Sequence, residues 1–154
     1  MGNSGKVWVI LMLLGQAIST IDEKKRMIIP AKFRGYFHEN ETVVVSKGFE
    51  GCLVIRNEPE FIKWQDKILN QSEGQKEARI LARQVFANSE ELKIDGKGRI
   101  NIPHSLLVLA DIKQKVIMIG LSNKIEIWSE TNWNRFNQDT NDKFELAAAT
   151  LDEI

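Results

Sequence analysis

Short apolar runs separated by charged turns make up much of this chain, and their composition is typical of β-strands. KIEIWS at residues 124–129 alternates apolar and polar side chains, which is the pattern of a half-buried strand. ETVVVSKG at residues 41–48 and QKVIMIG at residues 114–120 are short and β-branched, and CLVIRN at residues 52–57 follows soon after the first of them. These runs predict a mainly β core.

Helical patterns interrupt the strands at three places. Residues 71–89 contain EARILARQVFA, whose apolar residues recur at intervals of three and four, so we expect a linking helix with one apolar face. NEPEFIKWQDKIL starts at Asn57 with Glu60 three places on, which is a helix-capping spacing, and SETNWNRFNQ starts at Ser129 in the corresponding place. The two helices carry corresponding aromatics that predict core or interface packing: Phe61 with Trp133, and Trp64 with Phe136.

A block of ten residues occurs twice and organises the chain. IDEKKRMIIP at residues 21–30 returns as IDGKGRINIP at residues 94–103, which is 73 positions later. Each block leads into a short helical stretch that starts at its proline, and then into an apolar run that reaches Gly48 or Gly120, 72 positions apart. We therefore expect two copies of one unit: strand, Asp-x-x-x-Arg turn, strand, short helix, strand, strand, helix.

This repeat divides one globular unit into segments. We assign residues 1–11 to a leader or extension, 12–70 to the first repeat, 71–89 to the linking helix, 90–138 to the second repeat and 139–154 to a C-terminal tail. VWVILMLL, which follows Lys6, resembles the apolar part of a signal peptide, but its eight residues are too few to cross a bilayer. We expect no membrane partner and take Met12 as a plausible start.

The composition is that of an ordinary soluble protein, with 43% hydrophobic residues and a formal net charge of zero. The charge is uneven, because residues 22–34 and 93–99 together hold eight Lys or Arg against three Asp or Glu. This asymmetry predicts a basic face on an otherwise acidic body. Cys52 is the single cysteine, which excludes a disulfide framework and a Cys-based zinc site, and its apolar neighbours predict a buried thiol in a reducing cytoplasm.

Each repeated turn places an acid and a base at a fixed spacing, Asp22 with Arg26 and Asp95 with Arg99. An aspartate tolerates a tight turn and bonds its own backbone. An arginine four places on can reach either that aspartate or a phosphate, because its planar fork suits both. One interpretation is therefore a pair of salt-bridged turns with a structural role only.

A lysine lies two places after each of these aspartates, at Lys24 and Lys97. A structural salt bridge does not require this lysine, whereas a loop that faces phosphates benefits from it. The residues alone leave nucleic-acid binding and the structural interpretation about equally open. Gly98 supplies a permissive backbone angle in the second turn, where the first turn has Lys25, so we expect the first turn to be stiffer or different in shape.

Enzymatic chemistry has little support in this sequence. His38 and His104 are the only histidines, and neither lies near the cysteine or at a metal-ligand spacing. The chain has no nucleophile turn of the Gly-x-Ser-x-Gly type, and GKG at residues 96–98 is too short for a phosphate loop. We expect no enzyme, no metal site and no cofactor.

Four segments carry a resemblance to a known family: MLLGQAISTIDEKKRMIIPAKFR, KGFEGCLVI, IDGKGRINIP and GLSNKIEIWS. With them the chain resembles the MraZ family of bacterial transcriptional regulators over Met12 to about Gln138. The resemblance implies an α+β fold with a mainly β core, in which two tandem pseudo-twofold repeats form an AbrB-like swapped-hairpin barrel with peripheral helices. The family pattern usually has glycine before the first arginine, whereas this chain has Lys25.

The resemblance also implies a function. The protein would be a sequence-specific DNA-binding regulator of the division and cell-wall gene cluster, located in the cytoplasm at the nucleoid. It would bind short direct repeats in the double-stranded promoter DNA of its own gene as a ring-shaped homo-oligomer. The implied DNA-binding residues are Lys24, Lys25, Arg26, Lys97 and Arg99, oriented by Asp22 and Asp95. The alternative is a structural homo-oligomer or protein-interaction scaffold that does not bind DNA.

Overall fold

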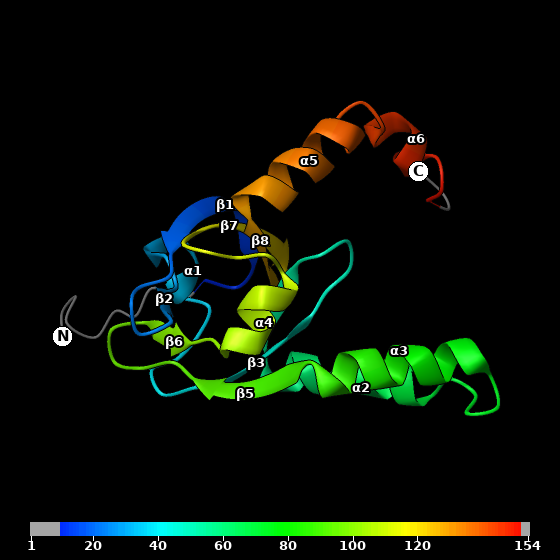
Figure 1. Cartoon of the computed structure of the whole chain (residues 1–154), viewed down its shortest axis with the longest axis horizontal. Helices are drawn as coiled ribbons and strands as arrows, with labels where there is room; N and C mark the ends of the chain where they lie inside the picture. Colours follow the sequence, from blue (N-terminus) through cyan, green and yellow to red (C-terminus); the bar gives the residue numbers. More distant parts are fainter. Residues whose placement is uncertain (1–9, 152–154) are drawn as a thin grey trace.

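The strands of the structure follow the β-branched and alternating runs of the sequence, in a computed structural model that describes residues 10–151. The first repeat contains β1 (Leu13–Thr20), β2 (Arg26–Ile28), α1 (Ala31–Arg34), β3 (Thr42–Lys47), β4 (Leu53–Asn57) and α2 (Glu58–Leu69). After α3 (Lys76–Ala87) come β5 (Ser89–Lys93), β6 (Arg99–Asn101), α4 (His104–Leu109), β7 (Lys115–Ser122), β8 (Ile125–Ser129), α5 (Glu130–Thr140) and α6 (Phe144–Ala148). The predicted unit therefore occurs twice, joined by the predicted linking helix (Figure 1). The leader proposed for residues 1–11 lies mostly outside the described residues, and the signal-like stretch at residues 7–14 lies outside them only in part, since Leu13 and Leu14 begin β1.

The two repeats exchange strands with one another. The larger sheet has six strands in the order β1-β7-β8-β4-β3-β5. β1 of the first repeat pairs antiparallel with β7 of the second, and β5 of the second repeat pairs antiparallel with β3 of the first. β2 and β6 form a separate two-stranded antiparallel ladder. The α+β class and the mainly β core are thus as predicted.

The hydrogen-bonded order of the larger sheet is open. It ends at β1 and at β5, which do not pair with each other, and the β2–β6 ladder stays separate from both. The sheet is therefore not a closed barrel, unlike the prediction. β2 and β6 pair only with each other, as strands of three residues each, so neither extends the larger sheet from β1 or β5 to join its two edges.

A pseudo-twofold axis relates the repeats, and two residue pairs mark it. Met27 pairs with Ile100 in the β2–β6 ladder, and these residues are 73 positions apart, which is the offset of the repeated block. Val54 pairs with Glu126 where β4 meets β8, and these are 72 positions apart. A residue that pairs with its own equivalent lies on the axis, so the axis passes through the small ladder and the middle of the large sheet.

The one-residue change in offset lies in a hairpin turn. Lys47 is opposite Leu53, and Gly120 is opposite Ile125, so Gly120 corresponds to Lys47. The predicted correspondence of Gly120 with Gly48 is therefore wrong by one residue. Five residues join Lys47 to Leu53 and four join Gly120 to Ile125, and a turn accepts such a change without disturbing the strand register.

The main core lies between the inner face of the large sheet and the β2–β6 ladder. Met27 and Ile100 point into it from the ladder, Phe33 from α1 and Leu106 from α4, and all four are buried. The sheet contributes alternate residues, as expected for strands with one face on this core. These are Val43, Val45, Leu53, Ile55, Val116, Met118, Ile125 and Ile127.

A second apolar cluster covers the opposite face of the sheet under α5. Trp128 is at its centre, with Trp133 at 5.4 Å and Phe136 at 5.2 Å between ring centroids. Phe61 is likewise buried and meets Phe86 of α3 edge to face at 6.4 Å. The prediction of packing is confirmed for these three paired aromatics.

Cys52 belongs to the second cluster as a buried thiol. Its side chain is 1% exposed, and its Sγ donates to the backbone oxygen of Phe49 at 3.3 Å. Burial raises the pKa of this thiol far above its usual range, and the negative charge of Glu126 adds to the effect. The thiol is therefore inert, and the predicted structural role is confirmed.

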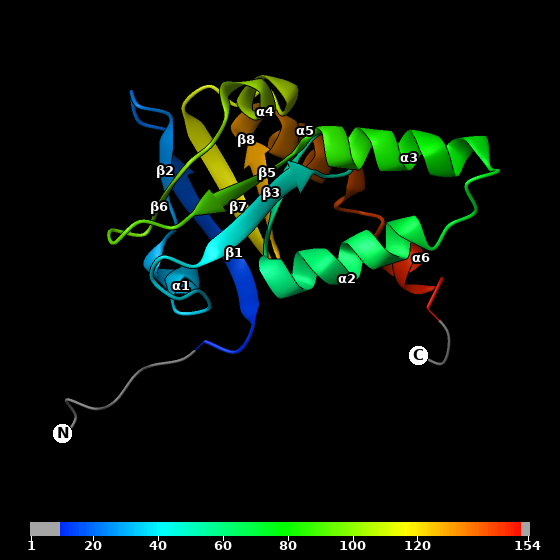
Figure 2. The ribbon, with the colours of Figure 1, turned by 90° about the horizontal axis from the view of Figure 1, so that it is seen from below.

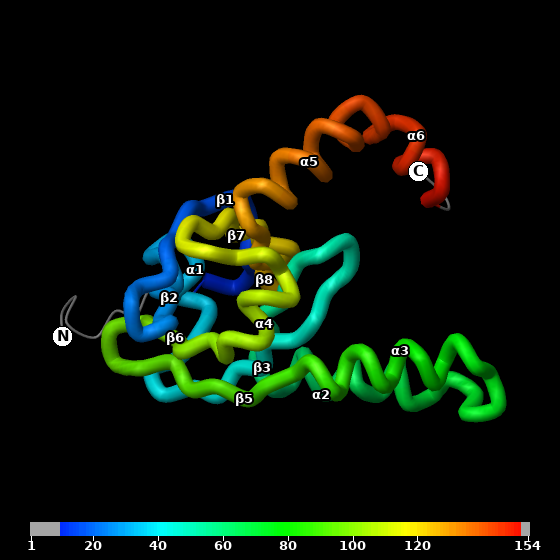
Figure 3. The backbone as a smooth tube through the Cα atoms, in the orientation of Figure 1, coloured from blue at the N-terminus to red at the C-terminus, as the bar shows by residue number. Residues whose placement is uncertain are grey.

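Both capping predictions are confirmed, and the capped helices start two arms. The amide of Glu60 donates to Asn57 Oδ1 at 3.0 Å, and the amide of Asn132 donates to Ser129 Oγ at 3.0 Å. The α2–α3 hairpin and the α5–α6 segment project from the body on the side away from the β2–β6 ladder (Figure 1, Figure 3). The ladder is therefore left uncovered at the other end.

Truncation of a core residue that pairs with strands of both repeats tests this core. Ile127 is fully buried between Leu53 and Met118, so Ile127→Ala lowers the free energy of unfolding by about 2–5 kcal/mol, since it leaves a cavity. Val108→Ala is the control, because Val108 is 64% exposed on α4, and its effect stays within about 0.5 kcal/mol. Chemical denaturation followed by circular dichroism measures both. Equal effects of the two substitutions would contradict the assigned core.

Candidate nucleic-acid interface

The first Asp-x-x-x-Arg turn is closed by one carboxylate. Asp22 Oδ1 accepts the amides of Lys24 and Arg26, each at 2.9 Å. Asp22 Oδ2 accepts Nε of Arg26 at 2.9 Å. The amide of Lys25 donates to the backbone oxygen of Asp22, and the amide of Asp22 donates to that of Arg26. A single side chain therefore fixes both the turn and the position of the guanidinium.

The second turn repeats this arrangement. Asp95 Oδ1 accepts the amides of Lys97 and Arg99 at 2.9 Å, and Asp95 Oδ2 accepts Nε of Arg99 at 2.7 Å. The amide of Gly98 donates to the backbone oxygen of Asp95 at 3.0 Å or less, as Lys25 does in the first turn. The two turns therefore have the same hydrogen bonds although their sequences differ at two positions.

Lys25 and Gly98 occupy the same left-handed position. The φ angle of Gly98 is 76° and that of Lys25 is 63°. A side chain with a Cβ costs roughly 1–2 kcal/mol in this region, because the Cβ crowds the following carbonyl. The absence of glycine from the first turn therefore does not change its shape, contrary to the expectation of a different shape, and it adds strain instead.

The β2–β6 ladder presents both arginines on one face. In its register Arg26 lies opposite Asn101, and Ile28 lies opposite Arg99. Met27 and Ile100 point into the core, so strand alternation directs the other four side chains outward. Arg26 and Arg99 are diagonal neighbours on this outer face, at a typical separation of about 7–8 Å.

The basic side chains of the turns surround this outer face. Lys24, Lys25 and Lys97 are exposed, and the side chains of Arg26 and Arg99 are 29% and 28% exposed. Both turns lie at the end of the molecule opposite the α2–α3 hairpin (Figure 2). Within residues 10–151, the Nη1 and Nη2 atoms of both arginines have no hydrogen-bond partner. The structure thus brings the five predicted binding residues together with terminal donors facing solvent.

Three residues of this surface do not follow from the repeated motif. Arg34 of α1 donates from Nε and Nη2 to the backbone oxygen of Ile29 at 3.2 and 3.0 Å, and it lies where a Cβ of Gly98 would stand. Ile28 is exposed on the same face as the arginines, and so is Asn101. Strand alternation from the buried Met27 would have indicated Ile28 and Asn101, but the position of Arg34 depends on the tertiary fold.

The turn aspartates are held in their charged form. The hydrogen bond from the Arg99 amide, supported by the bonds from the Arg99 guanidinium and the Lys97 amide, lowers the pKa of Asp95 to about 2. The Arg26 amide and guanidinium and the Lys24 amide likewise lower the pKa of Asp22 below its usual value. Each aspartate with the turn amides and guanidinium that it accepts, here called a clamp, is therefore ionised at neutral pH, and its negative charge offsets part of the charge of one arginine.

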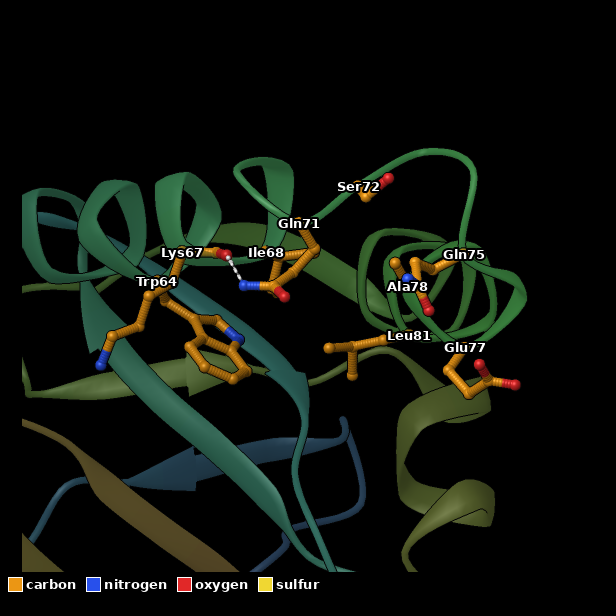
Figure 4. Close-up of a pocket in the computed structure, with 9 residues that line it drawn as sticks. All are labelled: Trp64, Lys67, Ile68, Gln71, Ser72, Gln75, Glu77, Ala78 and Leu81. Carbon is orange, nitrogen blue, oxygen red and sulfur yellow. Dashed lines mark hydrogen bonds between the residues drawn. The ribbon is translucent and has the colours of Figure 1, made fainter.

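A cleft between α2 and α3 gives no sign of catalytic chemistry. It has a volume of about 420 Å³ and is lined by apolar and amide side chains with Lys67 and Glu77 (Figure 4). Gln71 Nε2 donates to the backbone oxygen of Lys67 at 3.3 Å, and neither a histidine nor a cysteine lines the cleft. The cleft belongs to the helical arm, far from the ladder.

Two general searches of the described residues complete the picture. The part of the chain that the structure describes holds no group of three or more His, Cys, Asp and Glu side chains able to bind a metal ion. Between residues 10 and 151, no helix combines the length and the apolar composition needed to cross a bilayer.

The strained lysine gives a stability prediction. Lys25→Gly raises the free energy of unfolding by about 1 kcal/mol, because glycine adopts the left-handed angle without steric cost. Gly98→Ala is the matched substitution in the second turn, and it lowers stability by at least about 1 kcal/mol, since its Cβ would also meet the Arg34 guanidinium. Urea denaturation compares both variants with the parent. A loss of stability in Lys25→Gly would contradict the strain.

The clamps also give a pH dependence. Because the folded pKa of Asp95 is about 2 against an ordinary value of 3.8, its clamp stabilises the protein above the ordinary value and is lost as the pH falls through 3.8 towards 2. The Asp95→Asn variant has no titrating group at this position, so its free energy of unfolding falls less steeply than that of the parent between pH 3.8 and 2. Denaturation midpoints measured at several acidic pH values test this. Parallel curves for the two proteins would show that the clamp does not contribute.

Comparison with known proteins places these repeats in a family. The profile of the family described as "MraZ protein, putative antitoxin-like" matches residues 12–84 and again residues 85–154. Proteins named "Transcriptional regulator MraZ" from Mesoplasma florum and Thermoanaerobacter pseudethanolicus are 41% and 40% identical to this chain over 92% and 93% of it, and over 96% and 99% of their own lengths. The protein of that name from Mycoplasmoides gallisepticum is 35% identical over 92% of this chain and 99% of its own length.

These matches confirm the resemblance carried by the repeated block. The two profile matches follow one another along nearly the whole chain, and the relatives align with it almost from end to end. The relatives are named as transcriptional regulators, which confirms the prediction that this protein is not an enzyme. With both of its Asp-x-x-x-Arg repeats, the chain belongs to the MraZ family.

Proposed function

We propose that this protein is a sequence-specific DNA-binding transcriptional regulator of the division and cell-wall gene cluster, which acts in the cytoplasm at the nucleoid. It binds short direct repeats in its own promoter as a ring-shaped oligomer. The observation that carries the proposal is the outer face of the β2–β6 ladder, where Arg26 and Arg99 are clamped side by side with their terminal donors free. The names of the relatives support regulation of transcription as its role.

The shape of the ladder suits the major groove of DNA. The major groove admits a two-stranded β-ribbon, and an arginine binds guanine O6 and N7 with two donors at once. In Arg26 and Arg99 the aspartate takes only Nε, so both Nη atoms remain for a base. The exposed lysines of the turns extend beyond the ribbon, where they contact phosphates and set its register.

A neutral subunit needs several such contacts at once. Each phosphate neutralised contributes about −0.9 to the slope of log affinity against log salt, so the few cations of one subunit bind weakly. Several linked subunits on one DNA gain roughly a hundredfold or more in avidity if their spacing fits. A ring of subunits would therefore give these loops a useful affinity for DNA. It predicts several short, evenly spaced sequence motifs in the bound DNA.

The helical arms offer surfaces for such an assembly. Large apolar side chains are exposed on both arms: Ile62, Leu69, Ile80, Phe144 and Leu146. Because the α2–α3 arm and the α5–α6 arm differ, contacts between them are head to tail, and a head-to-tail contact that closes makes a ring.

A structural homo-oligomer without DNA binding is the competing function. It is favoured by the same clamps, since a salt bridge that closes a turn needs no ligand. It does not require the exposed lysines or the free Nη donors on one face. Salt-dependent binding to promoter DNA, compared with random DNA, separates the two functions.

Removal of the arginines tests the proposal. Arg26→Ala and Arg99→Ala each weaken binding to the promoter by about 1–3 kcal/mol per site, through loss of a bidentate base contact. Arg83→Ala is the control, because Arg83 is exposed on α3, away from the ladder. Mobility shifts with promoter and random DNA measure the affinities, and size-exclusion chromatography confirms that the assembly is unchanged.

Two further outcomes decide between the functions. Lys97→Ala, which removes a phosphate contact, weakens binding to all sequences and flattens the salt slope by about 0.9 for each bound subunit. If the Arg26→Ala/Arg99→Ala double variant keeps the affinity and footprint of the parent, the face does not read DNA and the structural function holds.

A further inference from the structure

The outer face of the β2–β6 ladder is symmetric in its arginines and asymmetric in their neighbours. The pseudo-twofold axis exchanges Arg26 with Arg99, which are 73 positions apart, and it exchanges Ile28 with Asn101 at the same offset. The first exchange leaves the surface unchanged, whereas the second replaces an apolar side chain by an amide. The axis is therefore broken at the centre of the proposed DNA-binding face.

The ladder places each arginine directly beside a different neighbour. The amide of Ile29 donates to the backbone oxygen of Gly98, and the amide of Ile102 donates to that of Lys25, so bonded positions alternate along the ladder. Arg26 with Asn101 and Ile28 with Arg99 are then the non-bonded pairs, whose Cα atoms lie about 4.5 Å apart with side chains in contact range. One arginine thus borders an amide and the other borders a branched alkyl group.

We infer that Ile28 and Asn101 give the arginine face its direction on DNA, an inference that rests on the proposed DNA-binding function. Asparagine pairs with adenine through N6 and N7, whereas an apolar side chain contacts the methyl group of thymine. The two arginines, related by the axis, read guanines related by the local dyad of the DNA. Ile28 and Asn101 then discriminate the bases that flank these guanines, and they do so differently on the two sides.

Direction matters because of the proposed assembly. A fully twofold-symmetric ribbon binds a site equally well in both orientations, so a row of such ribbons would not distinguish direct from inverted repeats. In a ring every subunit presents its ribbon in the same sense. A ribbon with different neighbours at its two arginines therefore selects motifs that all point the same way, which gives direct repeats a physical cause.

An exchange of the two neighbours tests the inference. Ile28→Asn and Asn101→Ile are made together, which reverses the asymmetry and leaves every arginine, lysine and aspartate in place. Both side chains are exposed, so circular dichroism of the exchange variant should match the parent. A DNA-cleaving iron chelate is attached at Glu23→Cys, since Glu23 is exposed in the first turn and Cys52 is buried.

The position of cleavage reports which end of each motif faces the first repeat. In the protein with native Ile28 and Asn101, cleavage falls on one side of each promoter motif, and in the exchange variant it moves to the other side. The single variant Asn101→Ile makes the two neighbours alike, so cleavage falls on both sides and preference for adenine at the flanking position drops by about 5–150-fold.

The failures of the two proposals are distinguishable. Cleavage on the same side in the parent and the exchange variant, with unchanged affinity, overturns the role of Ile28 and Asn101 but leaves DNA binding intact. An absence of promoter binding by the parent protein overturns both. An unchanged adenine preference in Asn101→Ile overturns the assigned amide contact.

Discussion

One carboxylate that closes a turn and holds a guanidinium is the interaction on which the proposed site depends. Asp22 and Asp95 each accept two turn amides and one arginine Nε, and bonds to a charged acceptor are roughly twice as strong as neutral ones. Two strands of three residues are too short to be stable by themselves. The β2–β6 ladder therefore depends on these clamped turns at its ends and on the burial of Met27 and Ile100 beneath it. The same bonds that make the ladder possible aim its arginines outward.

The core and the proposed site both depend on the alternation of inward and outward side chains along β2 and β6. Met27 and Ile100 lie on the pseudo-twofold axis and fill the core between the ladder and the large sheet. Because successive strand residues face opposite ways, the residues on either side of Met27 and Ile100 lie on the outer surface, around the point where the axis leaves the ladder. The exchange of β1 and β5 between the repeats then fixes the two halves relative to each other. A shift of one residue in the β2–β6 register would bury an arginine and expose Met27 or Ile100. Burial of these two residues therefore also fixes the geometry of the proposed site.

The periodic parts of the fold could be predicted from the sequence, and the long-range parts could not. The β-branched runs, the capped helix starts and the repeated block are local signals, and the structure confirms the elements they predict. The predicted equivalence of Gly48 with Gly120 was wrong because the turn between β3 and β4 has one residue more than the turn between β7 and β8. The strand sequences do not show on which side of the glycine that residue lies. Arg34 beside Gly98 was missed because only the tertiary fold brings α1 onto the second turn. The arginine pair followed from the motif, whereas Ile28 as its exposed neighbour required the register of the ladder.

The strained lysine shows which property the first turn favours. Lys25 adopts a φ of 63° where its counterpart is glycine, and the turn would be more stable with glycine there. Strain of this kind persists where the surrounding structure enforces it, and it concentrates at functional surfaces. Lys25 lies beside Arg26 at the edge of the face, so the strain adds one positive charge where a polyanion would bind. Met27 and Ile100 on the axis differ in identity but are both apolar, as burial in the core requires, whereas outward positions are free to differ in polarity as well. Under the proposed function, the strain at Lys25 lowers stability while its side chain places one more cation at the edge of the DNA-binding face.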